Sequence, residues 1–348
     1  MTPHVPGRSN ESWVADPTVA WNIVLTARLA APPDVAEITR ALARLADERG
    51  WRVPDSDAIH LGTTEELVRR FASDAGDHSP VTLGLDGNTL VIRAHHRHLD
   101  GGGLLALLHA LTGTPLTSSA RGVGDRPEGS ALRSTVLRLT EVAFAPPARV
   151  QRSASTPVDH DAFAARTVPG SPRTAELVLA GAAAIGRWNA ARGGSTRRVA
   201  VAVGVSRTGG ADLSIGENSG WLRIRNVERL TPDEVARAVS TAPLVATPTG
   251  VLRSRPVRDR LVSTGLKVLA PRLGSTLLVS HLGRVDAPDV EDLAFFPVTG
   301  GGSGMSLGAV TLRDRTVLTL RARGRQHSDE GLQEILETLG ALVESARG

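Results

Sequence analysis

The chain has 348 residues, of which 41% are hydrophobic and 22% are charged, so it can form a large core in one domain or two lobes. It contains no cysteine, which excludes disulfides, thiolate nucleophiles and cysteine-type zinc sites. The net charge is only +4, tyrosine is absent, and no apolar run could span a bilayer or act as a signal core. We therefore expect a cytoplasmic protein that binds neither nucleic acid nor membrane.

Strands and helices are predicted to alternate through the first third of the chain. Thr63 and Glu66 form the pattern of a capping box at a helix start, and Asp86-Gly87-Asn88 is typical of a hairpin turn. The predicted elements are, in chain order, a strand over 21–29, helices over 34–49 and 63–71, strands over 81–85 and 89–95, and a helix over 104–111.

The second half is predicted to mix strands and helices in the same way. Residues 114–170 are rich in Pro, Gly, Ser and Arg, and we interpret them as the crossover between two lobes. Beyond them we predict helices over 173–192 and 330–344, a helix that starts at 231–234, strands over 198–206, 221–227 and 275–280, and a hairpin of 307–312 with 316–322. The fold class is therefore α/β or α+β, with lobes over 1–165 and 166–348.

One short segment carries the chemistry: His95-His96-Arg97-His98-Leu99-Asp100-Gly101, placed between a predicted strand and a predicted helix. Backbone N–H groups at a helix N-terminus are available to anionic oxygen. Strand alternation puts His95 and His96 on opposite faces, and periodicity alone does not decide which one faces a cleft. Asp100 is expected either to orient an imidazole directly or to hold the loop through an arginine.

The heptapeptide resembles the HHxxxDG signature of the condensation domains of nonribosomal peptide synthetases. It also satisfies the HxxxDG of related CoA-dependent acyltransferases with the chloramphenicol-acetyltransferase fold. Weaker similarities follow in the family's order at 49–52, 173–207, 215–220 and 279–284, where His281 stands in place of the asparagine of an "SNLG" segment. The chain is shorter than most condensation domains and has no aromatic DFGWG-type segment.

The resemblance implies a two-layer α+β sandwich of two chloramphenicol-acetyltransferase-like lobes in a V-shaped arrangement, with the active site between them. In the family the second histidine, here His96, acts on the acceptor, and His95 supports it. Asp100 would be structural, paired with Arg52 or Arg28, and Gly101 would let a backbone N–H approach an oxyanion. The residues that the resemblance places along the substrate channel are Asn218, Trp221, Ser280, His281 and Ser303, although Ser280 and His281 fit simple strand-end hydrogen bonding equally well.

The implied function is acyl transfer from a coenzyme A or phosphopantetheine thioester to an amine or hydroxyl acceptor in natural-product biosynthesis. Neutral imidazole can take a proton from such an acceptor at neutral pH. We expect a stand-alone, monomeric acyltransferase with no bound cofactor and no metal, acting on a small-molecule acceptor. An acyl or peptidyl carrier protein is a further expected partner, and the basic stretch 253–272 is either its docking surface or a solvated helix face.

Two alternatives remain open. His96, His98 and Asp100 fit an HxHxD core of metal-dependent hydrolases, with His160 as a later ligand, although Gly101 stands where that motif has another histidine. A noncatalytic docking module of the same fold is the other alternative. His98 distinguishes the first from the acyltransferase, because it is a ligand in one and a bystander in the other.

Overall fold

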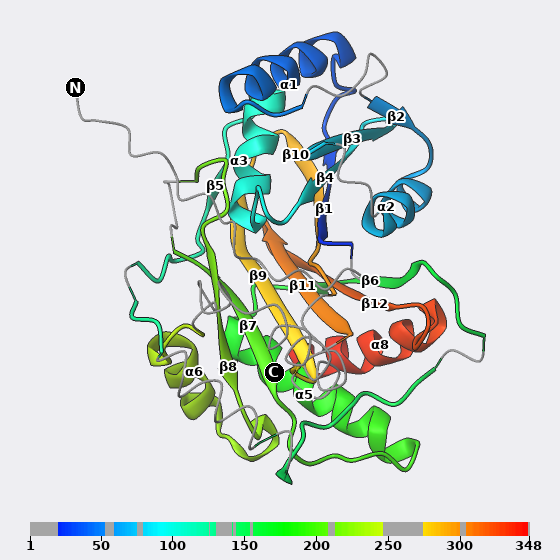
Figure 1. Cartoon of the computed structure of the whole chain (residues 1–348), viewed down its shortest axis with the longest axis vertical. Coiled ribbons are helices and arrows are strands. Elements are labelled where there is room, and N and C mark those ends of the chain that lie inside the picture. The colour runs from blue at the N-terminus through cyan, green and yellow to red at the C-terminus, as the bar shows by residue number, and fades with distance from the viewer. Residues whose placement is uncertain are drawn as a thin grey trace, which may run out of the picture.

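The computed structural model describes residues 20–52, 59–74, 79–124, 126–129, 141, 144–153, 156–207, 213–245, 274–299 and 304–346. These residues form two lobes, each a sheet with helices packed on it, with the first lobe uppermost in Figure 1. Within these ranges no helix has the length and apolar character needed to cross a bilayer. The predicted mixed α/β fold class is confirmed.

The first lobe is a five-stranded sheet in the order β10-β1-β4-β3-β2. Its strands are β1 (Asn22–Leu29), β2 (Ile59–Leu61), β3 (Val81–Asp86), β4 (Thr89–His95) and β10 (Val290–Phe296). No strand is predicted from the sequence at β10, which crosses from the second half of the chain and pairs antiparallel with β1 (Figure 1). The second half of the chain therefore contributes a strand to the first sheet. The lobe boundary at residues 165 and 166 stays a prediction.

Three helices belong to the first lobe, and local sequence sets their ends. Helix α1 (Val35–Arg49) is capped by Asp34 and ends at Gly50, whose φ of 62° is left-handed. Helix α2 (Thr64–Ser73) begins with the predicted capping box of Thr63 and Glu66. Helix α3 (Gly101–Thr112) begins three residues before the predicted start. Its first turn was not predicted because three consecutive glycines have low helix propensity.

The second lobe is built on the strand order β6-β12-β11-β9-β7-β8, with the short β5 paired to β9. Its strands are β5 (Thr117–Ser118), β6 (Asp161–Pro169), β7 (Val201–Ser206), β8 (Ser219–Ile224), β9 (Leu277–Asp286), β11 (Met305–Leu312) and β12 (Arg315–Arg323). Its helices are α5 (Thr174–Ala191), the 3-10 turn η1 (Val227–Arg229), α6 (Pro232–Thr241) and α8 (Asp329–Ser345). Strand β6 lies inside the segment predicted as crossover, and β8 starts two residues earlier than predicted.

Strand β9 contributes side chains to the cores of both lobes. Leu277 and Val279 pack in the core of the second lobe with residues of α5 and α8. Leu282 instead packs in the core of the first lobe, and a β-bulge follows it at Gly283, where φ is 74°. Because side chains alternate along a strand, Ser280 shares the face of Leu282 and His281 shares the face of Val279.

Candidate active site

His96 lies in the turn that connects β4 to α3. Strand β4 ends at His95, so the strand alternation used in the sequence analysis stops one residue before His96. The backbone N–H of His96 donates to the carbonyl of Trp21 at 2.7 Å, which ties the turn to the residue that precedes β1. The His96 side chain is half-buried.

Asp100 is buried at the start of α3 and connects the two lobes. Its Oδ1 accepts the N–H of Gly103 at 2.7 Å and caps the helix. Its Oδ2 accepts the N–H of Asn218 at 3.1 Å, and its own N–H donates to the carbonyl of Gly216 at 3.1 Å. Since residues 216 and 218 lead into β8, the aspartate fastens the histidine loop to the second lobe.

The electrostatics of Asp100 reflect this position. Burial raises the pKa of the Asp100 carboxyl above its ordinary value. The N–H of Gly103, the charge of nearby His96 and the N–H of Asn218 act in the opposite direction, whereas Glu217 adds to the rise. Asp100 and His96 are therefore close enough for the carboxylate to stabilise a charged imidazole.

Two glycines allow the close approach of α3 to the second lobe. A Cβ on Gly101 would lie 2.4 Å from Cδ2 of Leu282, and a Cβ on Gly103 would lie 2.5 Å from the carbonyl oxygen of Gly216. The second clash is with backbone, which cannot move aside as a side chain can. Gly101 and Gly103 are thus required by packing between the lobes as much as by the turn.

Neither arginine expected beside Asp100 is found there. Arg28 is exposed and its Nε lies 3.2 Å from Glu291 Oε2 on β10, while Arg52 is exposed after α1. The carboxylate is satisfied by backbone N–H groups instead. The segment 49–52 does contact the residues that lead into β8, but through Arg49 and not Arg52. The Nη1 of Arg49 donates to the carbonyl of Ile215 at 2.7 Å.

The flanking histidines contact each other and their own turn. The Nδ1 of His95 accepts the N–H of Arg97 at 3.3 Å, and the ring centroids of His95 and His98 are 6.1 Å apart. His160 is exposed at the start of β6. In the part of the chain that the structure describes, no three His, Asp or Glu side chains are grouped as metal ligands would be.

The predicted channel residues separate into two groups. Trp221 lies opposite Gly204, and Gly204 lies opposite Ser280 in the next strand. Trp221 and Ser280 therefore share one face of the sheet, which also carries Leu282 and meets α3. His281 points to the other face, where its Nδ1 lies 3.1 Å from Thr174 Oγ1 at the start of α5. His281 and Ser280 therefore cannot line the same channel. Ser303 and the basic stretch 253–272 lie outside the described residues.

Asn218 takes part in the site through its backbone, which sequence reasoning did not anticipate. Its N–H holds Asp100, while its side-chain Nδ2 lies 3.4 Å from Ser214 Oγ. Backbone donors have no residue-type signature, so the only sequence signal is the Gly-Glu-Asn run at 216–218 before a strand. Substrate binding by the Asn218 side chain stays a prediction.

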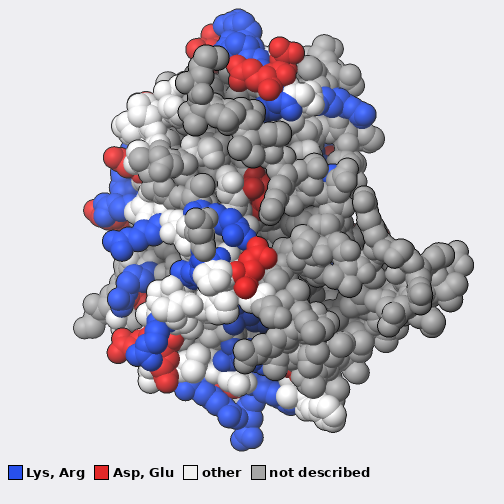
Figure 2. Space-filling model, turned by 60° about the vertical axis from the view of Figure 1, so that its left-hand side comes forward, with Lys and Arg blue, Asp and Glu red and all other residues white. Residues whose placement is uncertain are grey.

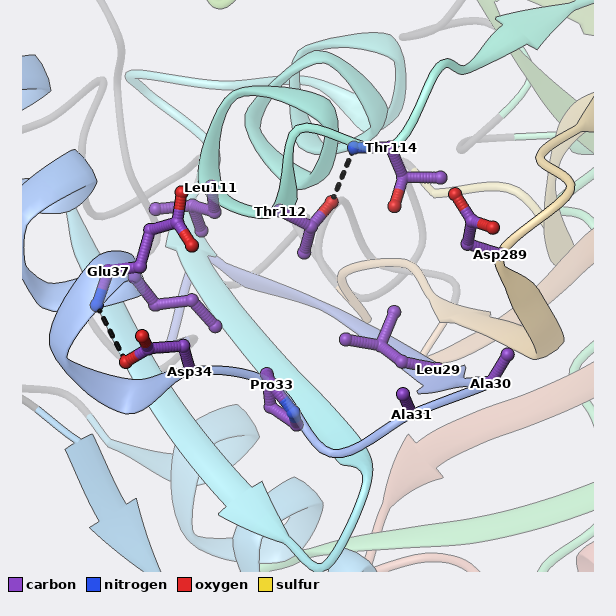
Figure 3. A pocket seen from close by; sticks show the side chains of 11 residues that line it. Leu29, Ala30, Ala31, Pro33, Asp34, Glu37, Leu111, Thr112, Thr114 and Asp289 are labelled. Atoms are coloured by element: carbon purple, nitrogen blue, oxygen red, sulfur yellow. Dashed lines mark hydrogen bonds between the residues drawn. The ribbon is translucent and has the colours of Figure 1, made fainter.

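A pocket of about 260 Å³ lies at the opposite end of α3 (Figure 3). Asp34, Glu37 and Asp289 line it, and Asp34 already caps α1 by accepting the N–H of Glu37. The 12 residues of α3 span about 18 Å, so this acidic hollow is remote from His96. Its carboxylates also make it unsuitable for the phosphates of an acyl donor.

Basic side chains of the described residues do not form one continuous patch on the face shown in Figure 2. Arginines there alternate with carboxylates and uncharged residues. Elsewhere in the chain, pairs such as Arg207 with Glu128 at 2.6 Å and Arg284 with Asp314 at 3.1 Å also neutralise part of the arginine charge. On this face, the described residues therefore add no continuous basic surface to the stretch predicted at 253–272.

Comparison with solved structures decides the fold family. The starter condensation domain of rhizomide synthetase, a mutant crystallised with C8-CoA and Leu-SNAC, aligns over 97% of this chain and 91% of its own at 14% identity and a TM-score of 0.59. The first condensation domain of the calcium-dependent antibiotic synthetase aligns over 94% and 93% at 16% identity and 0.54. The chain has the condensation-domain fold.

The fold is shared more widely than one reaction. The epimerization domain of the third module of tyrocidine synthetase B aligns over 94% of this chain and 92% of its own at 12% identity and a TM-score of 0.52. No family model matches the sequence, and no curated protein matches it significantly. At these identities the likeness establishes the condensation-domain fold, and function has to be argued from the site.

Proposed function

We propose that the protein is an acyltransferase that moves an acyl group from a thioester to an amine or hydroxyl acceptor in natural-product biosynthesis. The observation that carries the proposal is the placement of His96 beside the buried Asp100 at the junction of the lobes. His96 takes the acceptor's proton as general base as the acceptor attacks the thioester carbon. The C–S bond then breaks, and the same proton passes from His96 to the sulfur, so that the donor leaves as a thiol.

The start of α3 supplies the rest of the chemistry. The N–H of Gly103 is used by Asp100, so those of Gly101 and Gly102 are the candidates to stabilise the oxyanion of the tetrahedral intermediate. Asp100 holds the turn and stabilises the charged imidazole. His95 supports the turn from behind, and Ser280 and Trp221 line the second-lobe side of the cleft.

Ligands of the structural neighbours support a thioester donor. One neighbour was crystallised with C8-CoA and Leu-SNAC, and another with a substrate analogue. For this chain we propose acyl-CoA or a carrier-bound acyl group as donor, a small-molecule acceptor and no resident cofactor.

The proposal is tested with His96→Ala against a panel of acyl-CoA and acyl-carrier donors. Loss of general-base catalysis lowers kcat by roughly 100- to 10,000-fold. His98→Ala is the matched control, since His98 lies two residues away in the same turn and has no role in the proposed reaction. Full activity of folded His96→Ala would overturn the mechanism.

The same pair of variants separates the acyltransferase from the metal-dependent hydrolase. In the structure both carboxylate oxygens of Asp100 accept backbone N–H groups, which competes with metal ligation. A hydrolase would lose activity in His98→Ala and on chelation, and elemental analysis of the purified protein would find about one or two metal ions per chain. Retained activity in His98→Ala contradicts that alternative. A docking module would keep its biological function in His96→Ala and lose it when the arginines of 253–272 are replaced.

A further inference from the structure

Arg321 on β12 is an arginine buried completely between the two lobes, and the proposed reaction does not use it. Its side chain is 0% exposed, and its Nε lies 2.7 Å from Asp161 Oδ2 on β6. A buried guanidinium needs a carboxylate and several acceptors to offset its lost hydration. Here Asp161 supplies the charge, and backbone carbonyls supply the acceptors.

Those carbonyls belong to the first lobe. Nη1 of Arg321 donates to the carbonyl of Asn22 at 2.6 Å, and Nη2 donates to the carbonyl of Ala72 at 2.9 Å. The first is the start of β1 and the second is the last turn of α2, where carbonyls have no helical partner. A cation at a helix C-terminus is also favoured by the helix dipole.

The guanidinium stands where the pairing of β1 with β10 has already ended. That ladder stops at Val24 and Phe296, whereas β1 continues to pair with β4 as far as Asn22 and His95. Nη1 of Arg321 reaches both Asn22 and Pro297, at 2.6 and 3.3 Å, and so bridges the gap. Asn22 is itself buried, and its Nδ2 donates to the carbonyls of Phe71 and Asp74 at 2.8 and 2.6 Å.

The segment held in this way is the one that holds the histidine turn. The carbonyl of Trp21 accepts the N–H of His96 at 2.7 Å, and Asn22 lies opposite His95. A short chain of contacts therefore leads from Arg321 through Asn22 and Trp21 to His96. Asp100 fastens the other end of the same turn to the second lobe.

We propose that Arg321 is a positioning residue for His96: its guanidinium fixes the Trp21-Asn22 backbone from the second lobe, and this backbone fixes the turn that carries the imidazole. The catalytic part of this inference rests on the proposed function, whereas the positioning part does not. Lysine at 321 keeps the charge beside Asp161, but a single ammonium lacks the planar fork that reaches carbonyls on β1 and α2 together.

The test compares Arg321→Met and Arg321→Lys with Arg166→Met as matched control. Arg166 lies on β6 in the same sheet and is paired with Glu337 and Glu344, and all of these partners belong to the second lobe. All variants are studied at a temperature at which circular dichroism shows them folded. Amide hydrogen exchange of His96 is measured first, because it requires no substrate.

We expect the His96 amide to exchange faster in both Arg321 variants and at the wild-type rate in Arg166→Met. With an active donor, kcat falls roughly 10- to 100-fold in Arg321→Met while each KM stays within about threefold, because misplacement of a catalytic group affects the transition state more than binding. If Arg321→Met does not fold, Arg321→Lys carries both measurements.

Unchanged protection of the His96 amide in a folded Arg321 variant overturns the proposal, and so does lost protection with unchanged kcat. Failure of the proposed function gives a different result: the wild-type protein transfers no acyl group from any donor, and the exchange data still decide whether Arg321 holds the turn.

Discussion

Two histidines of this protein lie near helix N-termini, and their surroundings are opposite. His96 is half-buried before α3, where Asp100 caps the helix and lies close enough for the two charges to interact. His281 lies beside Thr174 at the start of α5, and burial lowers its pKa to about 4. Glu176, in the first turn of α5, accepts the N–H of Arg173.

The difference shows what makes a histidine usable as a base. In the proposed reaction, the nearby carboxylate favours the charge that His96 carries after it takes a proton, and partial exposure lets an acceptor reach it. Burial without a carboxylate keeps His281 neutral and inaccessible. Both residues are histidines near a helix N-terminus, so the neighbouring carboxylate and the degree of burial account for the difference between His96 and His281.

The largest expected contrast is in turnover. His96→Ala lowers kcat by roughly 100-fold or more, whereas His281→Asn changes it by less than about threefold, because His96 is the proposed base and His281 is buried beside α5. Initial rates with the donor panel measure both. A large loss in His281→Asn with unchanged folding would return His281 to the substrate channel.

The second contrast is the pH dependence of stability. The folded-state pKa of His281 is about 4, below the ordinary 6.5, so the unfolded chain binds the proton first as pH falls. The stability that neutral His281 contributes is complete above about pH 6.5 and is lost progressively towards pH 4. The free energy of unfolding falls over this range by up to about 3 kcal/mol. His327, whose pKa burial and Arg152 also lower to about 4, acts in the same direction.

Urea unfolding at several pH values between 4 and 7.5 measures this effect. We expect His281→Asn to have a flatter profile than the wild type, with the remaining slope due in part to His327. An identical slope in both proteins would contradict the buried, neutral state of His281.

A smaller effect is expected where α3 meets the second lobe. Gly103→Ala puts a Cβ 2.5 Å from the carbonyl oxygen of Gly216 and lowers the free energy of unfolding by about 1–3 kcal/mol. Gly102→Ala is the control, because its nearest atoms, in Asp100 and Leu213, are 3.4 and 3.5 Å away. Thermal unfolding measures the stability of both variants. Equal stability of Gly103→Ala and Gly102→Ala would mean that α3 is not held against Gly216.

The smallest effect is expected at Arg28. Its ion pair with Glu291 joins side chains that are 49% and 45% exposed, so Arg28→Ala changes the free energy of unfolding by at most about 0.5 kcal/mol and leaves kcat unchanged. Denaturant titration and the rate assay check this. A tenfold fall in kcat would restore Arg28 as a partner of Asp100.

Much of the local structure was predictable because its causes are local. The capping box at Thr63 and Glu66 and the hairpin at Asp86-Gly87-Asn88 lie where their residue types require them. Strand β10 was missed because its partner β1 lies more than 250 residues earlier, and no local pattern reports that pairing. The first turn of α3 was missed because packing against Leu282 and Gly216 overrides the low helix propensity of glycine.

The heptapeptide at 95–101, the order of the weaker matching segments and the mixed fold class could be read from the amino-acid sequence, since each depends on residues near one another in the chain. The groups that hold His96 and Asp100 could be identified only in the folded protein. The partners of Asp100 are backbone N–H groups, and the Arg321 contacts are backbone carbonyls of another lobe. Every residue carries such groups, so only the fold shows which of them meet.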